Sequence, residues 1–236
     1  MSPIEELKRE LPNIEKILGY SFQEKSLIVL SFVHRSFVNE NRKIINDHNE
    51  RLEFLGDAIL GCAISDFLYN FLPHETEGKL STLRSELVDS HSCCEYLKDL
   101  DLEKYILLGK GEQITSRGRK NILADIFEAI IAAIYLDGGY QKAKDFILKH
   151  FESKFKKRIK APSRNYKAEL QDYFQKTYQT APIYQTLKET GPQHQKIFHV
   201  AVFLNEKEMG IGQGLSKKEA QQLAAKNALN KFEDIS

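Results

Sequence analysis

The stretch HNERLEFLGDAIL, residues 48–60, combines a row of acids with an otherwise mainly apolar pattern. Glu50, Glu53 and Asp57 are spaced i, i+3 and i+7, so on a helix they fall within roughly 60° of one another. Most of the remaining positions are apolar, and this indicates a core helix with a single acidic stripe. The residues therefore predict a helix that continues without proline to Phe71.

A second stretch, ILADIFEAIIAAIYL at residues 122–136, is apolar all round except at two acids. Asp125 and Glu128 are spaced i, i+3, so they share one face of a helix that should be buried. Buried carboxylates are costly unless they are paired or bind a cation, and Arg51 is the only basic residue in either stretch.

If the two helices pack together, their carboxylates converge with little compensating charge. A hard divalent cation such as Mg²⁺ or Mn²⁺ would balance them, because its preferred ligands are oxygens. Such a site suits phosphodiester hydrolysis. A solvated acidic helix face is the alternative, and the residues alone leave both interpretations open.

The composition is typical of a globular protein: 42% of the 236 residues are apolar, 28% are charged, and the net charge is +1. No apolar run approaches the roughly 20 residues of a membrane span. The N-terminal residues mix acids and bases, unlike a secretory signal. Three cysteines, two of them adjacent, form no disulfide framework. We therefore expect a cytoplasmic protein that does not bind membranes.

The chain divides by pattern into two domains. Residues 1–155 are expected to be mainly helical, with helices near 27–34, 51–71, 79–97, 122–136 and 140–155. Residues 156–162 are expected to form a basic linker that ends at Pro162. Residues 163–232 then read α-β-β-β-α, with elements at 165–178, 183–190, 196–204, 209–214 and 216–232. This order predicts a small α+β domain with both helices on one face of the sheet.

Four stretches resemble the signature of the ribonuclease III family. They are residues 48–60, LGYSFQEKSL at 18–27, EGKLSTLRSELV at 77–88 and ILADIFEAIIAAIYLDGG at 122–139. The resemblance extends over essentially the whole chain. It implies a mainly α endonuclease domain at 1–155 and a double-stranded RNA-binding domain at 163–232.

The resemblance also implies roles for the acids. Glu53, Asp125 and Glu128 match metal ligands for Mg²⁺, for which Mn²⁺ can substitute. Asp57 matches the acid that works with Glu128 at the scissile phosphate, so Asp57 and Glu128 are the expected catalytic residues. Glu50 and Glu77 match acids linked to substrate handling or dimer contacts.

The activity implied is hydrolysis of both strands of double-stranded RNA, but not DNA, by a homodimer. Phe54 matches an apolar side chain that enters the partner subunit. Products would carry 5′-phosphates and short 3′ overhangs, and the substrates would be ribosomal RNA precursors and some messenger and transfer RNA. The alternative is a double-stranded RNA-binding regulator that has lost catalysis.

In the second domain, Lys217 and Lys218 occupy the first turn of a helix that Ser216 should cap in a capping box with Glu219. Cations oppose the helix dipole there, and on the residues alone this placement fits either a phosphate clamp or two exposed surface lysines. The resemblance of GLSKKEAQQLAAKNAL, residues 214–229, to the family's last helix favours the clamp. The resemblance adds RNA-contacting roles for Glu169, Gln171 and His194.

Two basic features stay open. Gln221 stands where the family often has a third basic residue, so either the clamp is weakened or another residue such as Lys226 compensates. The run SRGRK at 116–120 either holds the RNA backbone beside the metal site or is a solvated loop.

Overall fold

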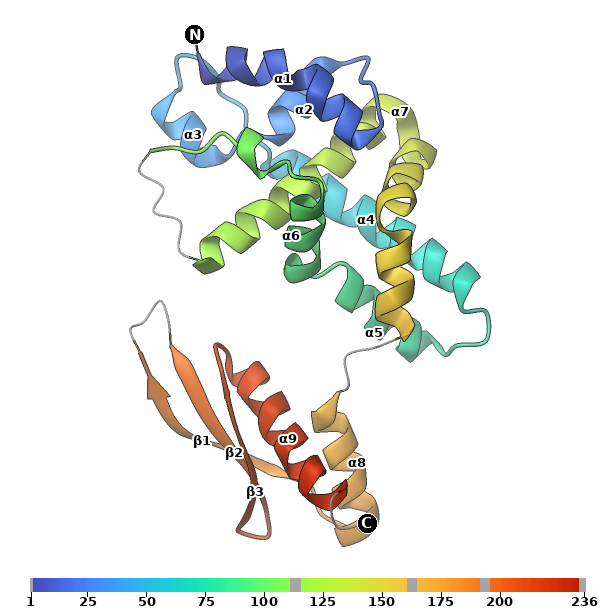
Figure 1. Cartoon of the computed structure of the whole chain (residues 1–236), viewed down its shortest axis with the longest axis vertical. Coiled ribbons are helices and arrows are strands. Elements are labelled where there is room, and N and C mark those ends of the chain that lie inside the picture. Colours follow the sequence, from blue (N-terminus) through green and yellow to red (C-terminus); the bar gives the residue numbers. More distant parts are fainter. Residues whose placement is uncertain (1, 111–115, 161–164, 192–195, 234–236) are drawn as a thin grey trace. The chain divides into compact units, whose positions relative to one another are not determined.

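The computed structural model describes residues 2–110, 116–160, 165–191 and 196–233. The chain forms two compact units, Met1–Pro162 and Ser163–Ser236, each with its own hydrophobic core (Figure 1). Within the described residues, no helix combines the length and the apolar character that crossing a membrane requires.

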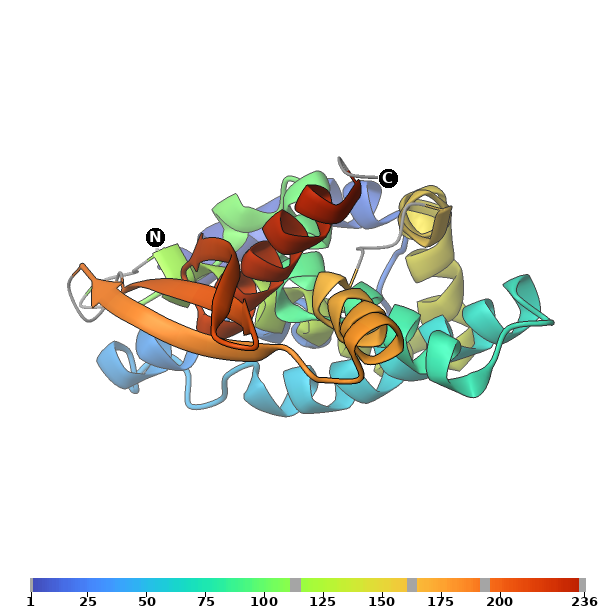
Figure 2. The same cartoon turned by 90° about the horizontal axis from the view of Figure 1, so that it is seen from below.

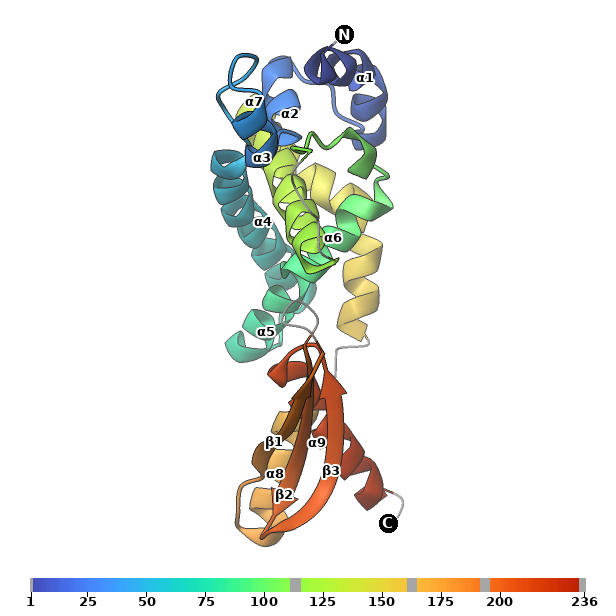
Figure 3. The ribbon, with the colours of Figure 1, turned by 90° about the vertical axis from the view of Figure 1, so that its left-hand side faces the viewer.

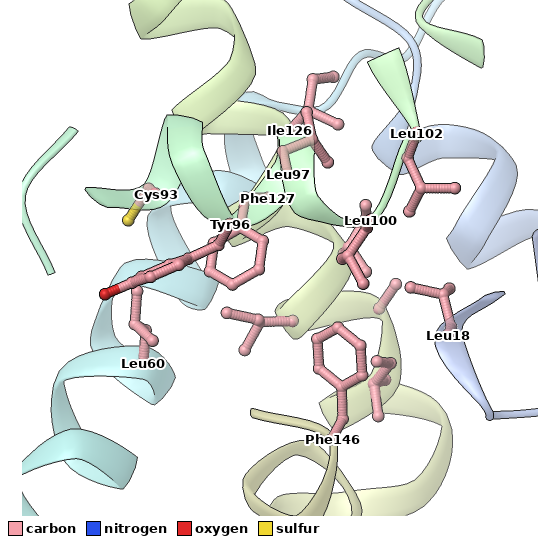
Figure 4. Packing of buried hydrophobic residues seen from close by; sticks show 14 of the residues in the cluster. Leu18, Leu60, Cys93, Tyr96, Leu97, Leu100, Leu102, Ile126, Phe127 and Phe146 are labelled. Atoms are coloured by element: carbon pink, nitrogen blue, oxygen red, sulfur yellow. The ribbon is translucent and has the colours of Figure 1, made fainter. Parts of the chain in front are cut away.

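The first unit is helical. Its elements are α1 (Pro3–Leu18), α2 (Lys25–Ser31), α3 (Arg35–Glu40), α4 (Glu50–Phe71), α5 (Glu77–Leu87), α6 (Ser90–Asp99), the 3₁₀ turn η1 (Glu103–Tyr105) and α7 (Ser116–Lys160). Helices α4 and α7 lie side by side at its centre (Figures 1 and 3). The core between α4, α6 and α7 is aromatic: the ring centroids of Tyr96 and Phe127 are 5.4 Å apart, and those of Tyr96 and Phe151 are 4.8 Å apart (Figure 4).

Two boundaries differ clearly from those that the sequence predicts, and a third agrees with it. The helix expected over 79–97 is two helices, because the Asp89 carboxylate accepts a hydrogen bond from the Ser92 amide and starts α6 as an N-cap. The two helices expected at 122–136 and 140–155 are both present: α7 is interrupted at Gly139, where the backbone is not helical, so its label spans two helical segments. Because α7 runs to Lys160, residues 156–160 of the expected linker are helical, and the two units divide after Pro162.

The bend in α7 lies beside an anchored loop. Gly139 has φ 81° and ψ 175°, a conformation that side chains rarely adopt. Two residues earlier, the Asp137 carboxylate accepts hydrogen bonds from the Tyr20 hydroxyl at 2.7 Å and the Glu24 amide at 2.7 Å. It also accepts one from the Gln23 amide at 3.0 Å. Asp137 thus connects the α1–α2 loop to α7.

The second unit has the order α8 (Tyr166–Tyr178), β1 (Ile183–Thr190), β2 (Ile197–Leu204), β3 (Lys207–Gly214) and α9 (Lys217–Glu233). The strands form an antiparallel sheet in the order β1-β2-β3. Both helices cover one face of the sheet, as Figure 3 shows, and Figure 2 shows α9 lying over the sheet. The predicted α-β-β-β-α arrangement is confirmed.

Small residues bring α9 close to the sheet. A Cβ atom added to Gly212 of β3 would overlap the backbone of α9 at Ala220 and Ala224. The start of α9 is capped by the Ser216 hydroxyl, which accepts from the Glu219 amide at 3.1 Å. The Glu219 carboxylate accepts from the Leu215 amide at 2.8 Å, one residue before the donor of a standard capping box.

Candidate active site

Helices α4 and α7 bring three carboxylates to one point. Glu53 projects from α4, and Asp125 and Glu128 project from α7. One oxygen from each of the three carboxylates lies within 4.8 Å of the others. The two helices can approach this closely because Gly56 of α4 packs on the backbone of Glu128, where an added Cβ would overlap the Glu128 carbonyl.

A fourth acid lies beside this cluster. Asp57, one helical turn after Glu53, is exposed and lines the same open hollow as Glu53, Asp125 and Glu128. Val88, Asp89 and Ser90, at the junction of α5 and α6, form another part of its lining. The hollow is therefore acidic and open to solvent, and the segment of α7 that carries Asp125 and Glu128 forms part of its wall.

The charge in this hollow is uncompensated by nearby cations. The ion pairs within the described residues include none of its four central acids, Glu53, Asp57, Asp125 and Glu128. Glu128 is only 8% exposed. Burial, together with the charges of Asp57, Asp125 and Glu53, raises the pKa of Glu128 to about 8.

The two other clustered acids are perturbed in the same direction. Burial and the charges of Glu53 and Glu50 raise the pKa of Asp125 to about 6. Burial, followed by the charges of Glu50 and Asp57, raises the pKa of Glu53. Three carboxylates that ionise reluctantly because they are partly buried and lie beside other acids form a donor set that fits a hard divalent cation.

The thiol of Cys93 also contacts this cluster. Its sulfur lies 3.7 Å from Oε1 of Glu128 and 3.5 Å from the carbonyl oxygen of Val88, and the residue is fully buried. Figure 4 shows Cys93 next to Tyr96, at the edge of the aromatic core. The Cys93 thiol thus connects the hydrophobic core to the carboxylate of Glu128.

In the second unit, basic residues gather near the start of α9. The Glu189 carboxylate of β1 pairs with Lys217 at 3.5 Å and with Lys196 at 2.9 Å. Lys218, the next residue of α9, is exposed. Glu169 and Gln171 lie on α8, where Glu169 is half-buried and Gln171 is exposed.

Comparison with known proteins gives the family. Residues 24–154 match the family described as "Ribonuclease-III-like". The chain belongs to the ribonuclease III family. Residues 166–232 match the "Double-stranded RNA binding motif", so a double-stranded RNA-binding domain follows the ribonuclease III domain.

Relatives match over nearly the full length. A protein named Ribonuclease 3 from Protochlamydia amoebophila is 57% identical, covering 99% of this chain and 96% of that protein. Ribonuclease 3 from Syntrophobacter fumaroxidans is 44% identical over 93% of each chain. Among solved structures, the nuclease domain of ribonuclease III from Campylobacter jejuni is 36% identical. It has a TM-score of 0.53 and covers 61% of this chain and 96% of that one.

Of the other two acids singled out by the ribonuclease III resemblance, Glu50 borders the acid cluster and Glu77 lies in a separate hollow. Glu50 pairs with Arg35 at 3.4 Å and lines a neighbouring hollow that shares Glu53 and Asp125 with the first. Glu77 lies in a separate hollow with Leu80 and accepts a hydrogen bond from the Ser81 hydroxyl.

The outcome for the basic segments is mixed. His194 lies outside the described residues, and so does the side chain of Arg117. Arg119 donates to Glu103 at 3.0 Å, so this member of the 116–120 run is paired within the ribonuclease III domain.

The sequence interpretation missed Asp89 and Cys93. The Asp89-Ser90 pair just after the 77–88 stretch is a typical helix start and was the available signal for Asp89. No spacing pattern connects Cys93 to Glu128, because their contact depends on tertiary packing.

Proposed function

We propose that this protein is a metal-dependent endoribonuclease that hydrolyses both strands of double-stranded RNA. The convergence of Glu53, Asp125 and Glu128 on one point, with Asp57 at the same hollow, is the observation that carries the proposal. The double-stranded RNA-binding motif in the same chain supports the choice of substrate.

Glu53, Asp125 and Glu128 are assigned as ligands of Mg²⁺, with Mn²⁺ able to substitute. Their uncompensated charge and all-oxygen chemistry support this assignment. When bound, the metal polarises a phosphoryl oxygen and lowers the pKa of its water.

Asp57 and Glu128 are the proposed catalytic pair at the scissile phosphate. Glu128 is buried, and without metal its pKa is raised to about 8. Asp57, in contrast, is exposed and can reach the substrate. Asp57 would accept a hydrogen bond from the attacking water, and Glu128 would help to hold the metal beside it. Glu50 and Glu77, both at helix starts, are assigned to substrate handling or dimer contacts.

A homodimer is the proposed assembly, and Phe54 supports it. This phenylalanine is 80% exposed on α4, one turn before the exposed Ala58. The nuclease domain of ribonuclease III from Campylobacter jejuni has a structurally flexible region that is involved in its dimer formation. A two-fold dimer suits a duplex because each subunit can serve one strand.

The second unit is proposed to hold the duplex. Lys217 and Lys218 would contact phosphates, and Glu169, Gln171 and His194 would contact the minor groove. Domains of this kind span about 16 base pairs and recognise shape more than sequence.

The products would carry 5′-phosphates and short 3′ overhangs. We propose a cytoplasmic role in processing ribosomal RNA precursors and some messenger and transfer RNA.

An end-labelled RNA hairpin provides the test. The protein is incubated with the hairpin in Mg²⁺, in Ca²⁺ or in EDTA, beside a DNA duplex of the same sequence. We expect staggered cuts in both RNA strands with Mg²⁺ only and no cuts in DNA. Tight binding to the hairpin without cleavage in Mg²⁺ or Mn²⁺ would instead establish a silent RNA-binding regulator.

A further inference from the structure

Lys167 of α8 contacts Gln221 of α9. Gln221 stands at the position where the family often has a third basic residue beside Lys217 and Lys218. Gln221 follows Lys217 by four residues, so the two side chains share one face of α9. Nζ of Lys167 donates a hydrogen bond of 2.7 Å to Oε1 of Gln221. The ammonium of Lys167 therefore lies at the tip of the side chain that the third basic residue would occupy.

The surroundings of this ammonium contain neutral partners. Nζ of Lys167 lies 4.8 Å from the centroid of the Tyr184 ring, whose face attracts cations. The backbone amide of Lys167 donates to Gln222 at 3.3 Å, and this fixes the start of α8 against α9. No ion pair within the described residues includes Lys167. Its charge is held in place without being neutralised.

Lys217 is in a different position. Its ammonium pairs with Glu189, which Lys196 also contacts, so an incoming phosphate must compete with a carboxylate there. Lys167 needs no such exchange. A preorganised cation with free N–H groups binds a phosphate at lower cost than one that must first break an ion pair.

Lys226 does not replace the missing cation. It follows Lys217 by nine residues, so at 100° per residue it lies roughly 180° away, on the opposite side of α9. Its ammonium lies over the ring of Tyr166, at 5.6 Å from the centroid. Of the two alternatives that the sequence left open, compensation would therefore require a residue other than Lys226.

We propose that Lys167 binds a backbone phosphate of double-stranded RNA and completes a three-cation clamp with Lys217 and Lys218. Gln221 orients the ammonium by accepting one of its three N–H groups and leaves two for the phosphate. This inference rests on the proposed double-stranded RNA substrate.

The salt dependence of binding tests the inference. Affinity of the full-length protein for an RNA duplex is measured by fluorescence anisotropy in Ca²⁺, from 50 to 250 mM KCl. Because each phosphate contact releases about one counterion, Lys167→Met should reduce the slope of log affinity against log salt by about 0.9. At low salt the affinity should fall about five- to tenfold. Lys226→Met is the matched control, since it removes a lysine that also lies over a tyrosine, and it should keep the wild-type slope.

Two further variants separate the charge from the packing of Lys167. Lys167→Met combined with Gln221→Lys returns a cation to α9 and should restore the slope. Gln221→Glu keeps every lysine but gives Lys167 a carboxylate partner, so it should weaken binding by a similar factor. This last variant changes only a half-buried position of α9, and it serves as the test if Lys167→Met fails to fold.

Unchanged slopes in Lys167→Met, or unchanged affinity in Gln221→Glu, would overturn the role of Lys167. Failure of the wild-type protein to bind the RNA duplex would instead refute the proposed function, so the two failures are distinguishable.

Discussion

Gly56 of α4 packs directly on the backbone carbonyl of Glu128 in α7, with no room for a side chain between them. The contact lies between Glu53 and Asp57 on one helix and at a clustered acid on the other. The spacing of the two helices therefore sets the spacing of the carboxylates, and a single glycine controls both.

Gly56→Ala should consequently damage stability and activity together. The added methyl group meets backbone, which cannot rotate away, so we expect a loss of about 2–3 kcal/mol in the free energy of unfolding. A displacement of about 1 Å at the acids should reduce cleavage at least 100-fold. Gly78→Ala is the control, because Gly78 is an exposed helical position with open space around it. This variant should be as stable as the wild type or more stable in denaturant unfolding, and it should cleave the hairpin at the wild-type rate. A fully active Gly56→Ala protein would show that the helix contact does not position the site.

Glu128→Gln should abolish cleavage but stabilise the metal-free protein at alkaline pH. The unfolded chain releases this proton near its ordinary pKa of 4.5, whereas the folded protein keeps it to about 8. The carboxyl group therefore does not weaken the fold below pH 4.5, and its ionisation destabilises the fold progressively as pH rises to 8.

The melting temperature in EDTA measures this effect. Glu128→Gln and wild type should melt together near pH 4.5, and at pH 9 the variant should melt several degrees higher. Glu6→Gln, at an exposed position of α1, should melt with the wild type throughout. If Glu128→Gln melts below the wild type at pH 9, the ionised Glu128 carboxylate does not destabilise the metal-free fold.

Binding of Mg²⁺ should release protons. Asp125 and Glu128 must ionise to act as ligands, and their pKa values without metal are about 6 and about 8. Between pH 6 and 8, Glu128 is the main source, so the apparent affinity should rise about tenfold per pH unit. Calorimetry in two buffers with different ionisation enthalpies counts the protons released. A pH-independent affinity in this range would remove Glu128 from the ligand set.

Asp137→Asn should loosen the connection between the α1–α2 loop and α7. Partial burial disfavours the charge of Asp137, but hydrogen bonds from Glu24, Tyr20 and Gln23 hold its pKa below the usual value. We expect a loss of about 1–3 kcal/mol at pH 7 in urea unfolding. Asp145→Asn, also in α7, should change little, because within the described part of the chain its carboxylate accepts a hydrogen bond only from the nearby Gln141.

The pH dependence has the opposite sign to that of Glu128. Because the folded pKa of Asp137 is depressed, its contribution is complete above about pH 4 and disappears as pH falls through the lower folded value. The difference between Asp137→Asn and wild type should therefore shrink below pH 4, and a constant difference would contradict this account.

The amino-acid sequence was sufficient for the helical period of α4, the buried α7 and the α-β-β-β-α order, because periodicity and capping are local. The clustering of Glu53 with Asp125 and Glu128 depended on an assumption that the two helices pack together. The structure confirms it, and Gly56 in mid-helix was a signal that periodicity alone does not use.

Features that depend on tertiary contacts could not be predicted from the periodicity of the sequence. Phe54 fits an apolar core position by period but is 80% exposed, and it lines the same hollow as Asp125 and Glu128 of α7. The contact between Lys167 and Gln221 joins residues 54 apart in sequence and belongs to no motif. The Gly-Gly pair was a local signal that could be used: it predicted the end of the first helical segment, and Gly139 does interrupt α7 there.

The crowding of like charges beneath the hollow also bears on the history of the chain. Replacing Asp125 or Glu128 with a neutral residue would relieve repulsion, so the first mutation that destroys the site would also raise the stability of the metal-free fold. A lineage released from the demand for cleavage would drift readily in that direction and would have to lose stability to return. If the proposed function holds, the repulsion among these acids is therefore a stability cost that the chain bears for the sake of the site.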